Sequence, residues 1–96
     1  MITTKLTLSD CLRPVDLTTS ETVDNQTVII HLGAGTYFSL NTTGSYLWDR
    51  LDGETSLGSI ATELVLLYGV DTATANNDVL TLAQELYDEG LVVRIE

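Results

Sequence analysis

The sequence predicts an α+β fold, in which an N-terminal antiparallel β-hairpin or three-stranded sheet is followed by three helices. Two β-rich runs, at residues 27–32 and 36–40, are separated by a short glycine-containing turn. Three amphipathic segments then occupy residues 42–89, and an extended apolar segment closes the chain at 91–95. This order is the outline of a winged helix-turn-helix. Ninety-six residues with 44% apolar content are expected to form one domain, residues 1–96.

The first 25 residues predict only peripheral structure. Residues 5–8 and 13–17 alternate polar and apolar side chains, which favours two short strands at the periphery of the sheet. Pro14 has no backbone N–H to donate, so the second of these segments is confined to an edge or an irregular turn. Residues 18–25 are almost entirely polar and predict a loop.

The strongest strand prediction is Thr27–Leu32, because it is rich in β-branched residues. Gly33–Gly35 is a hairpin connection of the length that commonly carries a glycine with positive φ. Thr27–Leu32 is therefore expected to pair antiparallel with Thr36–Leu40. Asn41 follows directly as a predicted N-cap, and a strand joined so tightly to a helix has a fixed orientation. If the outer edge of Thr36–Leu40 is open, it is a place to dock a peptide.

Three helices are predicted after this strand. The first spans about residues 42–51, the second begins at Thr55 or Ser56 and ends at Gly69, and the third runs from about Thr74 to Glu89. The apolar face of the second helix comprises Leu57, Ile60, Ala61, Leu64, Leu67 and Tyr68.

The third helix has a wider apolar arc than a small core requires. Its core stripe comprises Ala75, Val79, Leu82, Ala83 and Leu86. Leu80 and Tyr87 widen this arc to about 160° on the helical period. Two interpretations stay open: these two side chains cap the rim of the core, or they line a groove beside strand 36–40. Alternation along that strand turns Phe38 and Leu40 inward and leaves Tyr37 and Ser39 on the opposite face.

The charge is strongly unbalanced, with 14 acidic residues, 4 basic residues and a net charge of −10. Such a surface repels nucleic-acid phosphates and anionic lipid headgroups, and it favours neutral or basic partners. The acidity can equally serve solubility alone. DNA binding through the third helix is disfavoured, because that helix carries no Lys or Arg and would present acids to the phosphates: Asp78, Glu85, Asp88 and Glu89.

The residue pattern does not support catalysis or metal binding. His31 lies in the middle of a predicted strand, which favours a strand side chain over a general base. Cys11 has no basic cluster or helix N-terminus nearby in sequence to favour its thiolate. No His/Cys cluster has metal-ligand spacing, and Gly33–Gly35 is too short for a phosphate loop. We expect neither an enzyme activity nor a cofactor.

The expected location is the cytoplasm. No run approaches the roughly 18 apolar residues of a membrane helix. The N-terminus lacks the basic-then-apolar pattern of a secretory signal, and a single cysteine fits a reducing compartment. We expect no membrane partner and no nucleic-acid partner.

An ordered set of motifs runs through most of the chain. It begins with YFSLNTTGSYLWDRLDG at Tyr37 and continues with Ile60, Leu64, Tyr68, Asp78–Val79, Leu86 and Gly90–Val92. This set, which covers about residues 27–93, resembles the PqqD family, also called the RiPP recognition element. RiPP denotes a ribosomally made, post-translationally modified peptide. The ordered set is far more specific than any of its elements alone.

The resemblance implies a non-enzymatic domain that binds the N-terminal leader of a precursor peptide and presents it to modifying enzymes. In the family, the leader adds as an extra strand to the third β-strand and contacts the third helix. The implied peptide-binding residues are Thr36, Tyr37, Phe38, Ser39 and Leu40 on the strand and Val79, Leu80, Ala83 and Tyr87 on the helix. Backbone hydrogen bonds along such an edge supply affinity, and side-chain pockets supply specificity. Trp48, Asp52–Gly53 and Tyr68 also belong to the pattern and are interpreted as fold-forming.

The chain also resembles the free-standing leader-binding proteins of lasso-peptide clusters. The implied partners are then a precursor peptide, a transglutaminase-like leader peptidase and an asparagine-synthetase-like cyclase. The alternative is pyrroloquinoline quinone synthesis, with a radical-SAM enzyme as partner. Because an open edge can also recruit a second copy, we expect a monomer that can form a weak homodimer through this strand.

Overall fold

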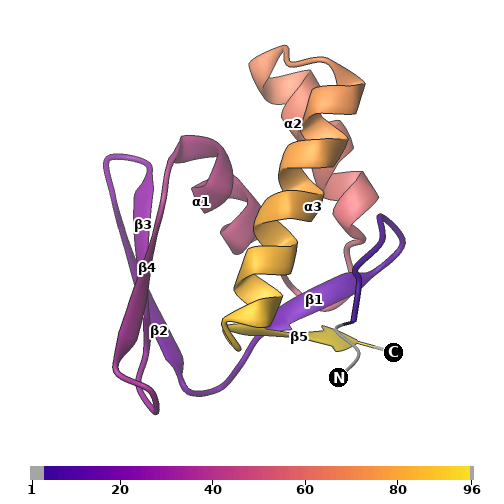
Figure 1. The fold of residues 1–96 in the computed structure, drawn as a ribbon. Coiled ribbons are helices and arrows are strands. Elements are labelled where there is room, and N and C mark those ends of the chain that lie inside the picture. Colours follow the sequence, from indigo (N-terminus) through magenta and orange to yellow (C-terminus); the bar gives the residue numbers. More distant parts are fainter. Residues whose placement is uncertain (1–3, 96) are drawn as a thin grey trace.

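The computed structural model describes residues 4–95, which form an α+β fold (Figure 1). A three-stranded antiparallel sheet has the order β2–β3–β4, and its strands are β2 Thr18–Val23, β3 Gln26–His31 and β4 Thr36–Leu40. A separate antiparallel pair is formed by β1 Cys11–Pro14 and β5 Val92–Ile95. The helices are α1 Thr42–Asp49, α2 Leu57–Tyr68 and α3 Thr72–Asp88. The predicted fold class, an N-terminal sheet followed by three helices, is confirmed.

The helix α1 joins the three-stranded sheet to the rest of the protein. It contacts β3 and β4 on one side and α3 on the other, while α2 packs along α3. In Figure 1 the sheet therefore stands to the left, the α2–α3 pair to the right, and the β1–β5 pair beneath the helices. Residues of the strand β4 and of the helix α3 line opposite sides of one surface hollow.

The polar segment 18–25 forms a strand and a turn, so the loop prediction is wrong. Asp24 and Asn25 have φ values of 53° and 63°, which is the geometry of a two-residue hairpin turn. The strand β2 pairs with β3 from Thr18 opposite His31 to Val23 opposite Gln26. Because most of β2 is exposed, an apolar alternation was not required, and the β-branched threonines favour the strand by themselves.

Two other strand predictions are corrected. Residues 5–8 have no regular secondary structure, yet Leu6 is buried and its N–H donates to Gln84 Oε1 at 2.9 Å. The segment is therefore fixed by a hydrogen bond to the Gln84 side chain of α3 and not by pairing with another strand. The strand expected at 13–17 is β1, displaced toward the N-terminus, and Pro14 lies at the end of its ladder opposite Val92.

The helix starts follow from polar N-caps. Asn41 Oδ1 accepts the Gly44 N–H at 2.9 Å, as predicted, and Ser56 Oγ accepts the Ser59 N–H at 3.2 Å. The third helix begins earlier than predicted, at Thr72, because Asp71 is its N-cap. The predicted end of α2 is confirmed, since Gly69 has φ 68° in the left-handed region.

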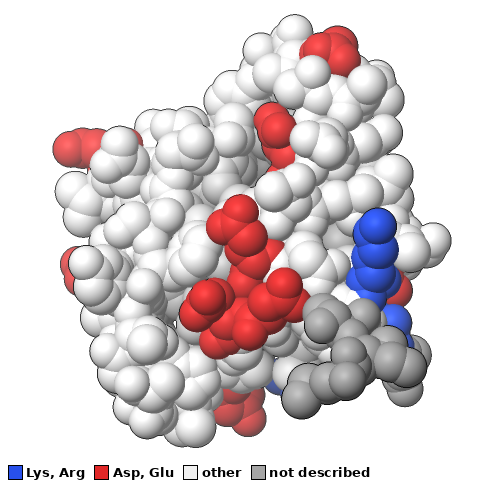
Figure 2. Space-filling model, viewed as in Figure 1, with Lys and Arg blue, Asp and Glu red and all other residues white. Residues whose placement is uncertain are grey.

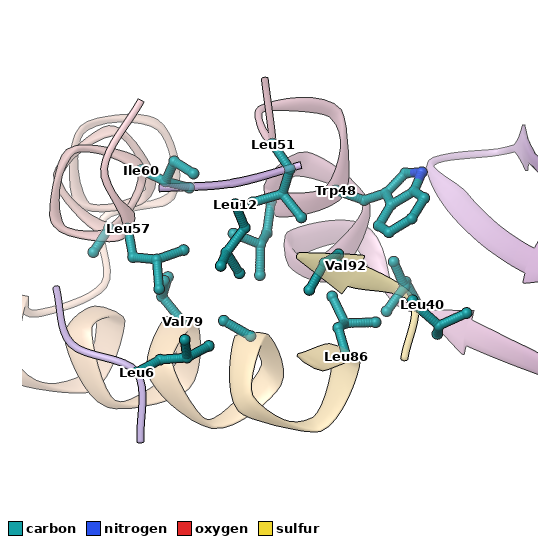
Figure 3. Close-up of a cluster of buried hydrophobic side chains, with 14 of the residues drawn as sticks. Leu6, Leu12, Leu40, Trp48, Leu51, Leu57, Ile60, Val79, Leu86 and Val92 are labelled. Atoms are coloured by element: carbon teal, nitrogen blue, oxygen red, sulfur yellow. The ribbon is translucent and has the colours of Figure 1, made fainter. Parts of the chain in front are cut away.

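A single buried cluster connects the helices to both sheets (Figure 3). Trp48 is 7% exposed, which confirms its predicted core position, and its Nε1–H donates to Ser20 Oγ at 3.1 Å. Leu67 and Tyr68 were expected on the apolar face of α2, but they are 59% and 45% exposed. The last turn of α2 therefore extends beyond the core, where the Tyr68 ring makes an edge-to-face contact with Tyr46.

A polar network ties α1 to α2. Arg50 Nε and Nη2 donate to the two Glu63 carboxylate oxygens at 2.8 and 3.0 Å, and the Tyr46 hydroxyl donates to the same carboxylate. The hydrogen bonds from Arg50, and then from Tyr46, hold the pKa of Glu63 below its ordinary value. The carboxylate therefore binds its two donors most strongly when it is ionised.

Glu63→Gln is expected to lower the melting temperature at neutral pH and to lose this effect in acid. Because the folded-state pKa of Glu63 is depressed, its stabilisation is present above the ordinary glutamate pKa of about 4.3 and is lost as the pH falls through the lower folded-state value. Thermal unfolding from about pH 7 to about pH 3 measures this difference. The exposed Glu54→Gln is the control, and a pH-independent difference for Glu63→Gln would contradict the role of the ionised carboxylate.

Candidate functional site

The strand β4 is an outer strand of its sheet, because β3 pairs with one side of it and no described strand pairs with the other. Its register with β3 runs from Thr27 opposite Leu40 to His31 opposite Thr36. Backbone groups on such an unpaired edge can accept a further extended chain.

The hairpin turn determines which backbone groups face the open edge. A two-residue turn makes Val23 and Gln26 a hydrogen-bonded pair, and hydrogen-bonded and non-hydrogen-bonded pairs alternate along an antiparallel ladder. Along β3, the residues directed at β4 are therefore Thr27, Ile29 and His31. Their β4 partners are Leu40, Phe38 and Thr36. The backbone N–H and C=O groups of Tyr37 and Ser39 consequently point outward, at the open edge.

The side chains of β4 alternate as predicted. Leu40 is 4% exposed and Phe38 is half-buried against the core, whereas Tyr37 is 75% exposed and Ser39 is also exposed. This fixes the register of the strand, because a shift by one residue would expose Leu40 and bury Ser39.

A groove separates β4 from α3. It is lined on one side by Phe38, Ser39, Leu40, Asn41 and Thr43, and on the other by Asn77, Asp78, Thr81, Leu82 and Glu85. We call this the β4–α3 groove. Its apolar lining comes from Phe38, Leu40 and Leu82, and its α3 wall is otherwise polar and acidic.

The close approach of α1 to α3 at one end of the groove depends on Gly44. A Cβ atom at this position would lie 3.1 Å from Leu82 Cδ2 and 3.3 Å from Leu40 Cβ. A larger side chain would therefore push against two apolar residues of the groove. The absence of a side chain at Gly44 allows Leu82 of α3 to pack closely against α1 and Leu40.

The structure places the α3 residues expected at this groove outside its lining, and their part in peptide binding stays a prediction. Val79 and Ala83 are 2% and 0% exposed and belong to the core. Leu80 lines a neighbouring hollow with Lys5, Leu6 and Gln84, which shares Asn77, Thr81 and Glu85 with the groove, and Tyr87 packs against the rim of the core. Of the predicted site residues, the structure brings Phe38, Ser39 and Leu40 to the groove and places the four α3 residues outside its lining.

The rotation of α3 explains the difference. The buried stripe faces α2 and the core, so the polar flank on one side of it turns toward β4. The flank that contains Leu80 turns toward the N-terminal segment, where Gln84 Nε2 donates to the Thr4 carbonyl at 2.9 Å. A polar helix flank normally indicates a solvated face. The single apolar residue that could have indicated the groove is Leu82, which was predicted to belong to the core stripe.

The groove is electrostatically negative. Asp78 and Glu85 are exposed, and neither carboxylate has a hydrogen-bond or ion-pair partner among residues 4–95. No Lys or Arg of this described part of the chain lines the groove. Figure 2 shows acidic atoms gathered on this face, around the C-terminal half of α3.

An open edge strand beside a groove is the arrangement of domains that bind extended peptides by strand addition. Residues 26–92 match the family described as coenzyme PQQ synthesis protein D (PqqD). The chain therefore belongs to the PqqD family. The comparison with curated proteins found no match.

The fold is similar to two solved structures. One, described as TbiB1 in complex with the TbiA(beta) leader peptide, is 29% identical, has a TM-score of 0.76, and is matched over 83% of this chain and 93% of that chain. The other, described as lasso peptide synthetase B1 complexed with the leader peptide, is 24% identical with a TM-score of 0.77, over 85% and 96% of the two chains. The second likeness shows the fold alone.

Two further properties bear on the site. None of the helices within residues 4–95 is long and apolar enough to span a bilayer. Across the same described residues, no group of His, Cys, Asp and Glu side chains is arranged to hold a metal ion.

Proposed function

We propose that this protein binds the leader segment of a ribosomally made precursor peptide as an extra strand on β4, beside α3. The observation that carries the proposal is the open edge of β4, with the backbone groups of Tyr37 and Ser39 directed into solvent next to the β4–α3 groove. Membership of the PqqD family supports it. So does the similar structure at 29% identity, since it is described as a complex with a leader peptide.

The proposed site consists of Thr36–Leu40 and the α3 residues that line the groove. The backbone of Tyr37 and Ser39 offers up to four hydrogen bonds, each worth about 1 kcal/mol net. Association itself costs about 4–15 kcal/mol in lost freedom, so these hydrogen bonds alone give little affinity. Contacts with the apolar groove residues, above all Leu82, must supply the remainder.

The proposed role is recognition rather than catalysis. The protein would present the bound precursor to a leader peptidase and a cyclase of lasso-peptide maturation, a pathway favoured by the resemblance of the sequence to lasso-cluster leader-binding proteins and named in the description of one of the two similar structures. The PqqD family name keeps pyrroloquinoline quinone synthesis, with a radical-SAM enzyme, as the alternative. The cytoplasm is the proposed location, because a ribosomally made precursor is available there before export.

The same edge allows a weak homodimer, in which β4 of one copy pairs with β4 of another. A bound leader would occupy this edge. Leader binding and dimer formation are therefore expected to compete, and the monomer is the state that binds.

Calorimetric titration with the leader of whatever short precursor peptide is encoded beside this chain tests the proposal. We expect saturable one-to-one binding to the leader and none to a scrambled peptide of the same composition. If the folded protein, verified by circular dichroism, does not bind the leader, the proposed function is wrong.

Leu82→Ala is expected to weaken leader binding about tenfold, because it removes apolar contact area from the groove. Leu80→Ala is the matched control on the opposite flank of α3, and it should change affinity by less than about twofold, since no groove contact is lost. The two variants are compared by titration after their helical content has been checked. If Leu80→Ala loses more affinity for the leader than Leu82→Ala, the leader contacts the Leu80 flank of α3, as the sequence predicted.

A further inference from the structure

We infer that the leader carries Lys or Arg side chains on the face it turns toward α3, where Asp78 and Glu85 recognise them. This inference rests on the proposed function and specifies the chemistry of its ligand. It starts from the two carboxylates on the α3 wall of the β4–α3 groove, which have no partner among the described residues.

The spacing of the two carboxylates fits an extended peptide. Asp78 and Glu85 are seven residues apart on α3, which is about 10.5 Å along the helix axis. An added strand advances about 3.3 Å per residue, and its alternate side chains face the same side. Basic side chains two or four positions apart, about 6.6 or 13 Å, can therefore reach both carboxylates through their flexible stems.

Among residues 4–95, no Lys or Arg forms an ion pair with Asp78 or Glu85. Arg13 pairs with Asp16, with 3.6 Å between Nη1 and Oδ1, and Arg50 pairs with Glu63, with 2.8 Å between Nε and Oε1. Lys5 lines the neighbouring hollow that Leu80 and Glu85 also line, without an ion pair between Lys5 and Glu85. The acidic side chains at the C-terminal end of α3 add to the same negative field (Figure 2).

The position of these acids distinguishes them from acids that serve solubility alone. A peptide in the groove would cover the neighbouring apolar residues Phe38, Leu40 and Leu82 and would partly remove Asp78 and Glu85 from water. A basic side chain compensates for this loss of hydration, whereas a neutral or acidic one does not. The acidic wall therefore selects for basic leader segments and against acidic ones.

The double variant Asp78→Asn/Glu85→Gln tests the inference, because it removes both charges with almost no change of shape. The matched control is Asp49→Asn/Glu54→Gln, which removes two exposed charges outside the groove lining. At low salt the groove variant should bind the leader about 3- to 30-fold more weakly, and the control should change affinity less than about twofold. The difference should shrink at about 0.5 M salt and should appear mainly in the association rate.

A second leader peptide, in which every Lys and Arg is replaced by Gln, completes the test. It should bind weakly, and the groove variant should bind it as well as the unmodified protein does. If the natural leader binds but the groove variant loses no more affinity than its control, or if that leader contains no Lys or Arg, the inference is overturned and the proposed function stands. If the natural leader does not bind at all, the proposed function fails first.

Discussion

Ser39→Pro is expected to weaken leader binding at least tenfold while leaving the protein folded. Proline removes the Ser39 N–H, which the ladder alternation directs at the open edge and not at β3. An edge strand tolerates proline at such a position, and the preceding residue, Phe38, already has the extended backbone that proline requires. When a peptide carbonyl is left without this donor in a covered interface, the binding free energy falls by about 1–3 kcal/mol. The proline ring also obstructs the approach of the peptide to β4.

Ser39→Ala separates the backbone from the side chain. It keeps the N–H and removes only an exposed hydroxyl, so its affinity for the leader should equal that of the unmodified protein. Titration and circular dichroism of both variants provide the comparison. If Ser39→Pro binds normally, the leader does not add to β4; if Ser39→Ala is equally impaired, the side chain and not the backbone makes the contact.

Trp48→Ala is expected to destabilise the fold by about 3–5 kcal/mol, a large fraction of the stability of a domain of this size. The indole is 7% exposed and lies at the end of the core next to the sheet, near Leu40 and Val92 (Figure 3). Its loss leaves a cavity in the region where α1 meets the sheet. Urea denaturation monitored by circular dichroism measures the change in unfolding free energy.

Ser20→Ala is the control for the indole hydrogen bond. It removes the acceptor of the Trp48 Nε1–H but keeps the ring, so it should cost only about 1–3 kcal/mol. A Trp48→Ala protein that keeps its stability but no longer binds the leader would place Trp48 in the binding site and contradict its role in the core.

The elements that the sequence predicted well are those with strong local signals. Asn41 and Gly69 are a helix N-cap and a left-handed helix end, and each requires only its own residue type and its neighbours. The Thr36–Leu40 strand was predicted with its observed bounds, because its alternation and its preceding glycine turn agree. These local signals were sufficient to predict the β4 wall of the β4–α3 groove.

The other wall depends on tertiary packing, which local patterns do not show. Leu80 widens the apolar arc of α3, yet the N-terminal segment covers that flank through Gln84, which lies close to Leu6 only in the folded chain. The polar strand β2 was missed for a related reason. The strand β2 is exposed, so its position is determined by the Asp24–Asn25 turn and by pairing with β3. Apolar residues contribute little to it.

The joint between the sheet and the helices has a mechanical consequence. The two walls of the groove belong to different parts of the molecule, the sheet and the α2–α3 pair, and α1 is the main connection between them, with Gly44 packed against Leu82 of α3. A peptide that bonds to β4 and also contacts α3 acts as a brace across this joint. If the leader binds as proposed, we expect the occupied protein to be stiffer than the empty one, so that an enzyme contacting both parts could distinguish the two states.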